Sequence, residues 1–178
     1  MPIEKLELIE PDVHYRISYV EALREGLHLD AATEIDIQLA KKDFAKYMEK
    51  RHDLSRPVTL ADGTKVRRVR QLDLWLVDGE RFLGMASLRP ELNDHLMKRG
   101  GNIGYAVRAS ERRKGYGDLI LKLTLPRARA LGMDRVLITC HDENIGSQRI
   151  IEKNGGVYQD RVKIPGRDLL ERRYWIAL

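Results

Sequence analysis

The sequence predicts an α/β protein in which a mixed β-sheet carries helices on both faces. Three observations support this fold class: alternating apolar runs typical of strands, helical periodicities between them, and the order of the two kinds of segment. After a short first strand and two helices come a strand pair, then strand, loop, helix, strand and helix, then a second strand pair. The chain has 178 residues, 43% of them hydrophobic, and we expect one domain that spans residues 1–178.

The N-terminal part of the chain consists of short regular segments. Residues 6–9 read as a strand that Pro11 ends, and helices are expected over residues 15–25 and 33–51. Thr33 is placed to cap the second of these helices, whose apolar positions fall on one face. We expect that face to pack in the core, and its members are Ala40, Phe44, Tyr47 and Met48.

The rest of the chain supplies the main strands. Residues 55–69 read as irregular, and strands at 72–77 and 82–88 are then expected to form a hairpin over Asp78-Gly79-Glu80. Residues 90–101 read as a loop. Further strands are expected at 103–107, 135–140, 157–162 and 173–177, with helices that begin near Gly117 and Gln148.

A basic, glycine-containing turn separates the strand at 103–107 from the helix that follows it. Its sequence is Arg112-Arg113-Lys114-Gly115-Tyr116-Gly117. Helix N-termini present unpaired N–H groups and partial positive charge, and glycine lets the backbone come close to a ligand. The layout is therefore typical of a phosphate-binding site. A P-loop does not fit because Lys114 precedes Gly115, and a dinucleotide fingerprint does not fit because Ile120 stands at its third glycine position.

The pattern that remains is R-x-x-G-x-G, formed by Arg112, Gly115 and Gly117. It resembles the pyrophosphate loop of the GNAT superfamily of N-acetyltransferases. Two later segments occur in the family's order: Asn144-Ile145-Gly146-Ser147, which opens a helix, and Glu152-Lys153-Asn154-Gly155, which closes it. The resemblance covers residues 72–178 well. It implies the GNAT fold, an α/β (α+β) architecture with a mixed, mostly antiparallel central sheet of about six to seven strands.

The resemblance also implies an activity: direct transfer of an acetyl group from acetyl-CoA to a primary amine of a small molecule or peptide. A backbone N–H near Ala106 or Val107 would be the oxyanion donor. No metal is expected, and the single cysteine, Cys140, argues against a thiolate zinc site. The residues that the resemblance assigns to acetyl-CoA binding are Tyr105, Ala106, Val107, Arg112, Arg113, Lys114, Gly115, Tyr116, Gly117, Asn144 and Ser147.

The sequence departs from the family pattern where the leaving thiolate is protonated. Many members carry a tyrosine general acid just before the Glu-Lys pair, and here Ile151 stands at that position. Tyr158 is our first candidate to replace it, with Tyr174, Cys140 or water as alternatives.

The general base has no motif of its own. The candidates are Glu91, Asp94 and His95, because the family places the loop before the key strand near the acceptor. Glu91 is the first choice, and His95 has the more suitable ordinary pKa. His141 and the pair Asp142-Glu143, which follow the next strand, are the alternatives.

Composition limits the class of partner. A net charge of +5 would suit a nucleic-acid-binding protein, but the basic residues are spread over clusters at 67–70, 112–114 and 172–173. We therefore do not expect DNA as a partner. The chain lacks an apolar run long enough to cross a membrane and an N-terminal signal segment, so we expect it in the cytoplasm.

Two alternatives to a small-molecule enzyme stay open. An acetyltransferase acting on a protein or an RNA-linked amine would also make use of the positive charge, and a non-catalytic CoA-binding regulatory module would account for Ile151. The acceptor has no recognisable motif. Dimers are common in similar proteins, so a homodimer is a further expectation.

Overall fold

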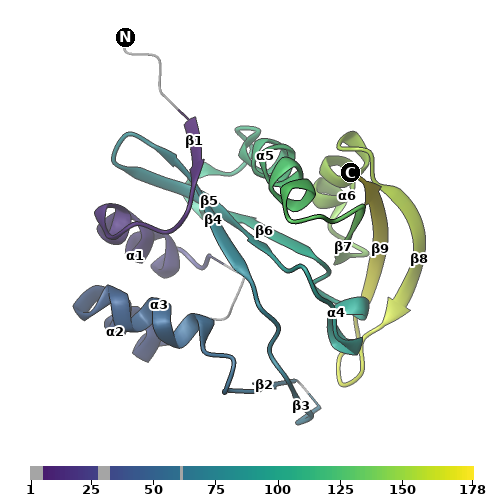
Figure 1. The fold of residues 1–178 in the computed structure, drawn as a ribbon, viewed down its shortest axis with the longest axis horizontal. Helices are drawn as coiled ribbons and strands as arrows, with labels where there is room; N and C mark the ends of the chain where they lie inside the picture. Colours follow the sequence, from purple (N-terminus) through teal and green to yellow (C-terminus); the bar gives the residue numbers. More distant parts are fainter. Residues whose placement is uncertain (1–5, 28–32, 61) are drawn as a thin grey trace.

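The computed structural model describes residues 6–27, 33–60 and 62–178. Figure 1 labels its elements along the chain. The strands are β1 (Leu6–Ile9), β2 (Val58–Thr59), β3 (Lys65–Val66), β4 (Leu72–Asp78), β5 (Arg81–Leu88), β6 (Ile103–Val107), β7 (Arg135–His141), β8 (Val157–Lys163) and β9 (Leu170–Ala177). The α-helices are α1 (Arg16–Arg24), α2 (Glu34–Lys42), α3 (Phe44–His52), α4 (Asp94–Lys98), α5 (Tyr116–Ala130) and α6 (Ile145–Lys153), and short 3-10 helices are η1 (Val13–Tyr15) and η2 (Ala109–Glu111).

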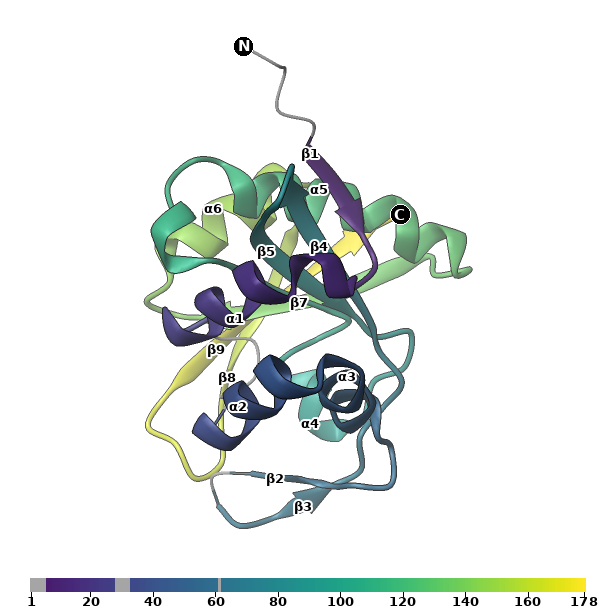
Figure 2. The same ribbon diagram turned by 90° about the vertical axis from the view of Figure 1, so that its left-hand side faces the viewer.

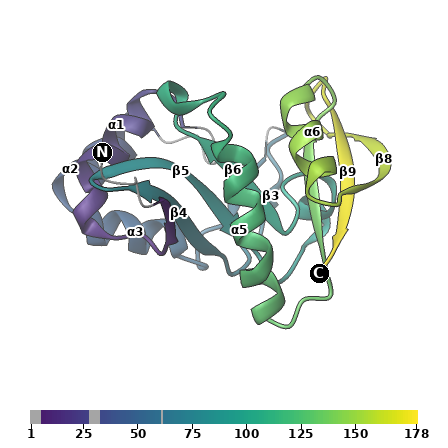
Figure 3. The ribbon, with the colours of Figure 1, turned by 90° about the horizontal axis from the view of Figure 1, so that it is seen from above.

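The main strands form two antiparallel sheets that lie side by side. One sheet has the order β1-β4-β5-β6 and the other the order β7-β9-β8, which together make seven strands. Helices α1 to α3 lie on one side of the first sheet, and Figure 3 shows α5 between that sheet and α6. The predicted fold class, with a mostly antiparallel sheet and helices on both faces, is confirmed.

Both faces of the central strands β4 and β5 are buried, each in a different apolar cluster. On the side of α1 to α3, Tyr19 stacks on Trp75 with ring centroids 4.4 Å apart, and Phe44 and Phe82 pack edge-on around the pair. On the other side, alternate residues of the same strands pack with α5, α6 and β7. This double burial places the most apolar strands in the middle of the first sheet.

The two sheets meet at Asn102, which is buried just before β6. Its backbone N–H donates to the Leu137 carbonyl at 2.7 Å, and its side-chain oxygen accepts from the Leu137 N–H at 2.7 Å. Its side-chain amide donates to the Arg89 carbonyl at 2.9 Å. Among the described residues β6 has a ladder partner, β5, on one edge only. The other edge of β6 therefore presents backbone N–H and C=O groups beside β7 and α6.

The second predicted helix is in fact two helices. Asp43 takes an extended backbone, with φ −143, and its side chain accepts from the Lys46 N–H at 3.0 Å, so one residue ends α2 and caps α3. A capping aspartate competes with helix continuation, which the periodicity did not reveal. The Thr33 cap is confirmed, because its hydroxyl accepts from the Asp36 N–H at 3.2 Å. The predicted core positions Ala40, Phe44 and Tyr47 are buried, and Met48 packs against them.

Two segments that read as irregular contain short regular elements. Residues 55–69 hold the hairpin β2-β3, whose turn includes Asp62 and Gly63, and residues 90–101 hold helix α4, capped by Asn93. Both are too short to show a period. Within the described ranges, the structure contains no helix with the length and apolar character that crossing a membrane requires.

Candidate active site

The basic turn forms an open helix N-terminus. Gly115, with φ +85, is the N-cap of α5, and no side chain of the described residues caps the helix start. A left-handed backbone at this position suits glycine, and an uncapped start leaves N–H groups available to an anion. Arg112, Arg113 and Lys114 are exposed beside it. The structure thus brings these predicted phosphate-binding residues together at one helix end.

The turn is anchored to α1 through Arg108. The Arg108 side chain donates to Glu25 at 2.8 Å and to the Ser18 hydroxyl at 3.0 Å, and the Ser110 N–H donates to Glu25 at 3.0 Å. The hydrogen bonds from Arg108, followed by those from Ser110, outweigh partial burial and lower the pKa of Glu25 to about 2. The N-terminal helices therefore fix the start of the basic turn.

Strand β6, α5 and α6 come together at Gly117. A Cβ atom at this glycine would lie 3.0 Å from Ile150 Cδ1, 3.6 Å from Val107 Cγ2 and 3.7 Å from Tyr105 Cε2. The Tyr105 hydroxyl lies 2.7 Å from the Ser147 hydroxyl, so it joins β6 to the first turn of α6. Burial raises the pKa of Tyr105 to about 12, although the Ser147 contact opposes the shift.

The remaining predicted binding residues flank this junction. Asn144 caps α6, and its side-chain oxygen accepts from the Ser147 N–H at 3.0 Å. Tyr116 begins α5 and packs against the apolar cluster under that helix. The Ala106 side chain faces the opposite way, toward the cluster under α1 to α3, so only its backbone is presented to the open edge of β6.

His141, the last residue of β7, lies beside a buried carboxylate. Its Nδ1 atom is 2.9 Å from Glu171 Oε1, and its Nε2 atom is 3.5 Å from Arg99 Nη2. Nδ1 makes no hydrogen bond to the described residues, so the Glu171 contact is electrostatic. The Glu171 side chain is 3% exposed. Burial raises the pKa of Glu171, while the charges of His141 and Arg99 oppose that rise.

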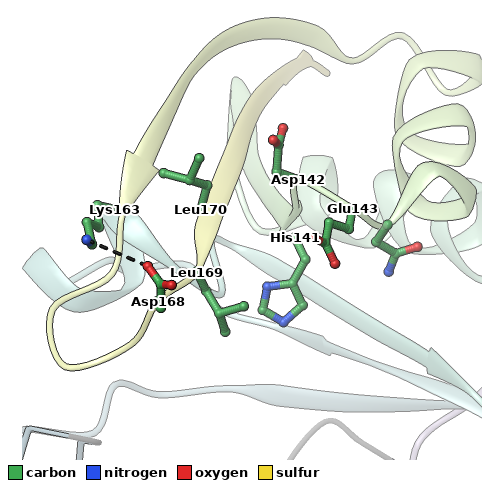
Figure 4. Close-up of a pocket in the computed structure, with 8 residues that line it drawn as sticks. His141, Asp142, Glu143, Lys163, Asp168, Leu169 and Leu170 are labelled. Carbon is green, nitrogen blue, oxygen red and sulfur yellow. Dashed lines mark ion pairs between the residues drawn. The ribbon is translucent and has the colours of Figure 1, made fainter.

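His141 opens into a cavity of about 670 Å³ between the end of β7 and the β8-β9 hairpin. Figure 4 shows the imidazole ring extending into this hollow, with Leu169 and Asp168 of the hairpin on the other side. A half-exposed imidazole with a buried carboxylate behind it is an arrangement that can accept a proton from a bound molecule.

A second cavity, of about 400 Å³, lies on the other side of Arg99. Figure 2 shows the elements around it, α3, α4 and the β2-β3 hairpin, at the lower end of the molecule. None of its lining residues is Asp or Glu. Six of them are arginines, namely Arg51, Arg67, Arg68, Arg70, Arg89 and Arg99.

The three predicted catalytic residues lie on different elements. Glu91 is exposed before α4 and lines neither cavity. His95 in α4 lines the second cavity. Tyr158 on β8 is 47% exposed, and its ring packs edge-on against Tyr174 at 5.5 Å. Ile151 is fully buried in the core.

Sequence reasoning named His141 only as an alternative and missed Glu171 and Arg99. The signal that could have found Glu171 is the pairing of β7 with β9, in which His141 and Glu171 are directly opposite. That register is not visible in the sequence. In the described part of the chain, no three His, Cys, Asp or Glu side chains gather as a metal site would require.

Comparison with solved structures agrees with the fold. The structure is similar to yncA from Salmonella typhimurium, solved with its cofactor acetyl-CoA, at TM-score 0.59 and 16% identity, covering 97% of this chain and 93% of that one. It is similar to a spermidine N-acetyltransferase chimera from Vibrio cholerae and hSSAT at TM-score 0.62 and 14% identity, covering 97% and 96%. A ribosomal-protein-alanine N-acetyltransferase from Brucella melitensis matches at TM-score 0.64 and 15% identity, covering 97% and 100%.

These identities are low, so the likeness establishes the fold alone. Comparison with curated protein sequences finds no match. The model of the Acetyltransferase (GNAT) domain family, however, matches residues 23–157, which is more than half of the chain. The match includes the basic turn, the open edge of β6 and the start of α6. The chain therefore belongs to the GNAT family of acetyltransferases.

Proposed function

We propose that this protein is an N-acetyltransferase that moves the acetyl group of acetyl-CoA directly to a primary amine of a small molecule or peptide. We further propose that residues 1–178 act as a single domain in the cytoplasm. The observation that carries the proposal is the uncapped N-terminus of α5 beside the open edge of β6, in a chain of the GNAT family. The thioester of acetyl-CoA would supply the activated acetyl group.

The residues around this junction fit a long ligand with a phosphate-rich end. The free N–H groups of α5, with Arg112, Arg113 and Lys114, would hold the pyrophosphate. The unpaired edge of β6, from Tyr105 to Val107, would pair with the pantetheine arm, and one of its N–H groups would donate to the acetyl oxygen. Asn144 and Ser147 would contact the arm from α6. Gly117 leaves the space that a Cβ atom would fill.

His141 is the general base that the geometry favours. A small rotation of its ring would let Nδ1–H donate to Glu171 and would turn Nε2, which now lies 3.5 Å from Arg99 Nη2, toward the cavity as the proton acceptor. The incoming amine must lose a proton to form the amide, so a neutral imidazole in reach of it suits this role. Glu91 and His95 remain the alternatives for the same step.

The leaving thiolate needs a proton or a hydrogen-bond donor. Since the pKa of Tyr105 is raised to about 12, its hydroxyl keeps its proton at neutral pH and can donate a hydrogen bond. Tyr105 and Ser147 lie where β6 meets α6, and both carry hydroxyl groups. Ile151 is buried and apolar, so it cannot donate a proton. Tyr158, on β8, remains the alternative donor.

Calorimetric titration with acetyl-CoA, followed by a thiol-release assay across amines and peptides, tests the proposal. Arg113→Glu should weaken binding of acetyl-CoA at least ~10-fold, because it places a like charge beside the phosphates. Arg127→Glu, an exposed arginine in the last turn of the same helix, is the matched control and should bind normally.

The outcomes separate the open alternatives. No binding of acetyl-CoA would overturn the proposal and the assignment of the loop. Binding without thiol release on any acceptor would favour a regulatory CoA-binding module. Thiol release on peptides or RNA-linked amines but on no small amine would move the acceptor to the macromolecular class.

A further inference from the structure

We propose that the arginine-lined cavity is a subsite for the acceptor, and that the preferred acceptors are small amines carrying a compact anionic group such as phosphate, sulfate or carboxylate. This inference rests on the proposed acetyltransferase function and adds the class of its substrate. The basic cluster Arg67-Arg68-Val69-Arg70 is separate from the α5 turn, so acetyl-CoA does not account for it.

Three of the arginines that line the cavity are not neutralised by a carboxylate of the described residues. Arg67, Arg68 and Arg70 form no ion pair with a carboxylate of the described residues. Arg68 instead donates to the Arg56 carbonyl at 3.1 Å, and the Arg67 carbonyl accepts from the Asn93 side chain at 2.9 Å. These contacts hold the segment in place and leave its guanidinium groups available for an anion, which arginine binds in a bidentate manner.

The deeper arginines are positioned by buried acids behind the cavity. Arg51, whose side chain is 8% exposed, donates to Asp73 at 2.5 Å, and His52 lies 3.1 Å from the same carboxylate. Arg99 lies 3.5 Å from Glu171, yet its Nη1 atom is buried without a hydrogen-bond partner among the described residues. Arg51 and Arg99 are therefore held at the back of the cavity by buried carboxylates.

His95 lies in a positive environment inside the cavity. Its pKa is lowered first by burial, then by the charges of Arg99, Arg167 and Arg89, with Asp62 acting in the opposite direction. Guanidinium groups that surround a partly buried space attract an anion more strongly than scattered surface charges do.

The cavity lies where an acceptor would need it. Arg99 lines this cavity and also contacts His141, the proposed base, from the other side. Gly100, also in the lining, leads into β6, whose far end at Val107 leads to the basic turn. The four steps between the five residues of β6 cover about 13 Å, at roughly 3.3 Å per step. Because Arg99 lies between this cavity and His141, an acceptor anchored here by its anion would extend its amine past Arg99 toward the base and the acetyl group.

The size and charge of the cavity favour small anionic amines over polyamines as acceptors. A volume of about 400 Å³ suits a small ligand. A polyamine would bring positive charge to a cavity lined by arginines, so we expect it to be a poor acceptor. This expectation separates the protein from the spermidine N-acetyltransferase whose fold it resembles.

Matched amines test the proposal in the thiol-release assay. O-phosphoethanolamine should exceed ethanolamine, and β-alanine should exceed β-alaninamide, by at least ~10-fold in kcat/KM, and spermidine should be the poorest. Arg67→Gln/Arg70→Gln should lower the ratio of anionic to neutral amine by ~10- to 100-fold, the range expected for lost hydrogen bonds to a charged group. Arg56→Gln, a nearby exposed arginine outside the lining, should keep the ratio. Equal kcat/KM within each pair would overturn the proposal.

A binding measurement separates this inference from the proposed function. O-phosphoethanolamine is titrated into protein saturated with CoA at constant ionic strength, so that the α5 turn is occupied. Binding that the Arg67→Gln/Arg70→Gln variant loses supports the subsite even if no amine is acetylated. Absence of binding by O-phosphoethanolamine would overturn the subsite. It would also be overturned if the double substitution weakened binding of a short RNA but not of O-phosphoethanolamine. Circular dichroism verifies that the variants fold.

Discussion

The Glu171 carboxylate lies 2.9 Å from Nδ1 of His141, because β7 and β9 pair in a register that sets these two residues opposite each other. The acid is buried, whereas the imidazole reaches the cavity at the end of β7. The pairing thus places an imidazole beside a buried acid at the end of β7. The family motifs in this part of the chain identify residues that bind acetyl-CoA but no general base. The pairing also supplies the sharpest test of the proposed chemistry.

Replacing His141 should abolish base catalysis. We expect His141→Gln to lower kcat by roughly 100-fold or more, the usual contribution of a general base, with acetyl-CoA affinity unchanged. Glu91→Gln is the comparison, and we expect near-normal turnover. The reverse pattern would assign the base to Glu91.

Gly117 should be intolerant of a charged side chain. Gly117→Glu places a carboxylate at the start of α5, where phosphates would bind, and should weaken acetyl-CoA binding by roughly 100-fold or more. Gly117→Ala is the control for bulk, since the one tight contact of its Cβ would be with the end of the Ile150 side chain at 3.0 Å. Calorimetric titration compares them, and unchanged affinity in Gly117→Glu would contradict the loop assignment.

The contacts of Glu25 with Arg108 and Ser110, which hold the start of the basic turn, should also stabilise the folded protein. The pKa of Glu25 is lowered from 4.5 to about 2 by Arg108 and Ser110, so its contribution is present above pH 4.5 and is lost as the pH falls toward 2. Since the side chain is partly exposed, we expect Glu25→Gln to lower the free energy of unfolding at pH 7 by only about 1 kcal/mol. The variant should also flatten the acid dependence of stability.

Denaturant unfolding at several pH values measures this effect. Glu21→Gln is the matched control, because Glu21 contacts the same arginine at 3.0 Å but is 54% exposed, and its effect should be smaller. If both variants lowered the free energy of unfolding equally, the contacts of Glu25 with Arg108 and Ser110 would not stabilise the protein more than an exposed ion pair does.

Asp73 should stabilise the folded protein and also hold Arg51 in place at the arginine-lined cavity. Burial alone would raise the pKa of this carboxyl, but the contacts from His52, Arg51 and Ser87 hold it well below its usual range. Asp73→Asn removes the charge and leaves Arg51 buried beside a neutral group. We expect a loss of about 3 kcal/mol in the free energy of unfolding, as for other broken buried pairs.

The pH dependence of Asp73 follows from the same shift. A lowered folded-state pKa means that the stabilisation is complete above the ordinary pKa near 3.8 and is lost only in strong acid. Asp73→Asn should therefore lose stability at neutral pH and vary less with acid than the parent. Asp53→Asn, at a partly exposed aspartate near the same helix end whose side chain accepts from Ser55, is the control, with a smaller expected change. A neutral outcome for Asp73→Asn would remove the anchoring role of this acid.

Much of the fold was predictable because its signals are local. The strands of the two main sheets and the α5 and α6 helices follow from periodicity, and the Thr33 cap from two residues three positions apart in sequence. The Asp43 break and α4 were missed, since one capping side chain decides the first and five residues form the second. Short elements carry too few residues for a period to be seen.

The sequence by itself determined the basic turn and its family, because consecutive residues between Arg112 and Gly117 set the backbone and the charge at one helix start. Only the tertiary structure decided the rest of the site. It paired His141 with Glu171 through strand register, joined Tyr105 to Ser147, and gathered arginines from distant segments around one cavity. These contacts depend on burial and packing between elements far apart in the chain, which neighbouring residues do not specify.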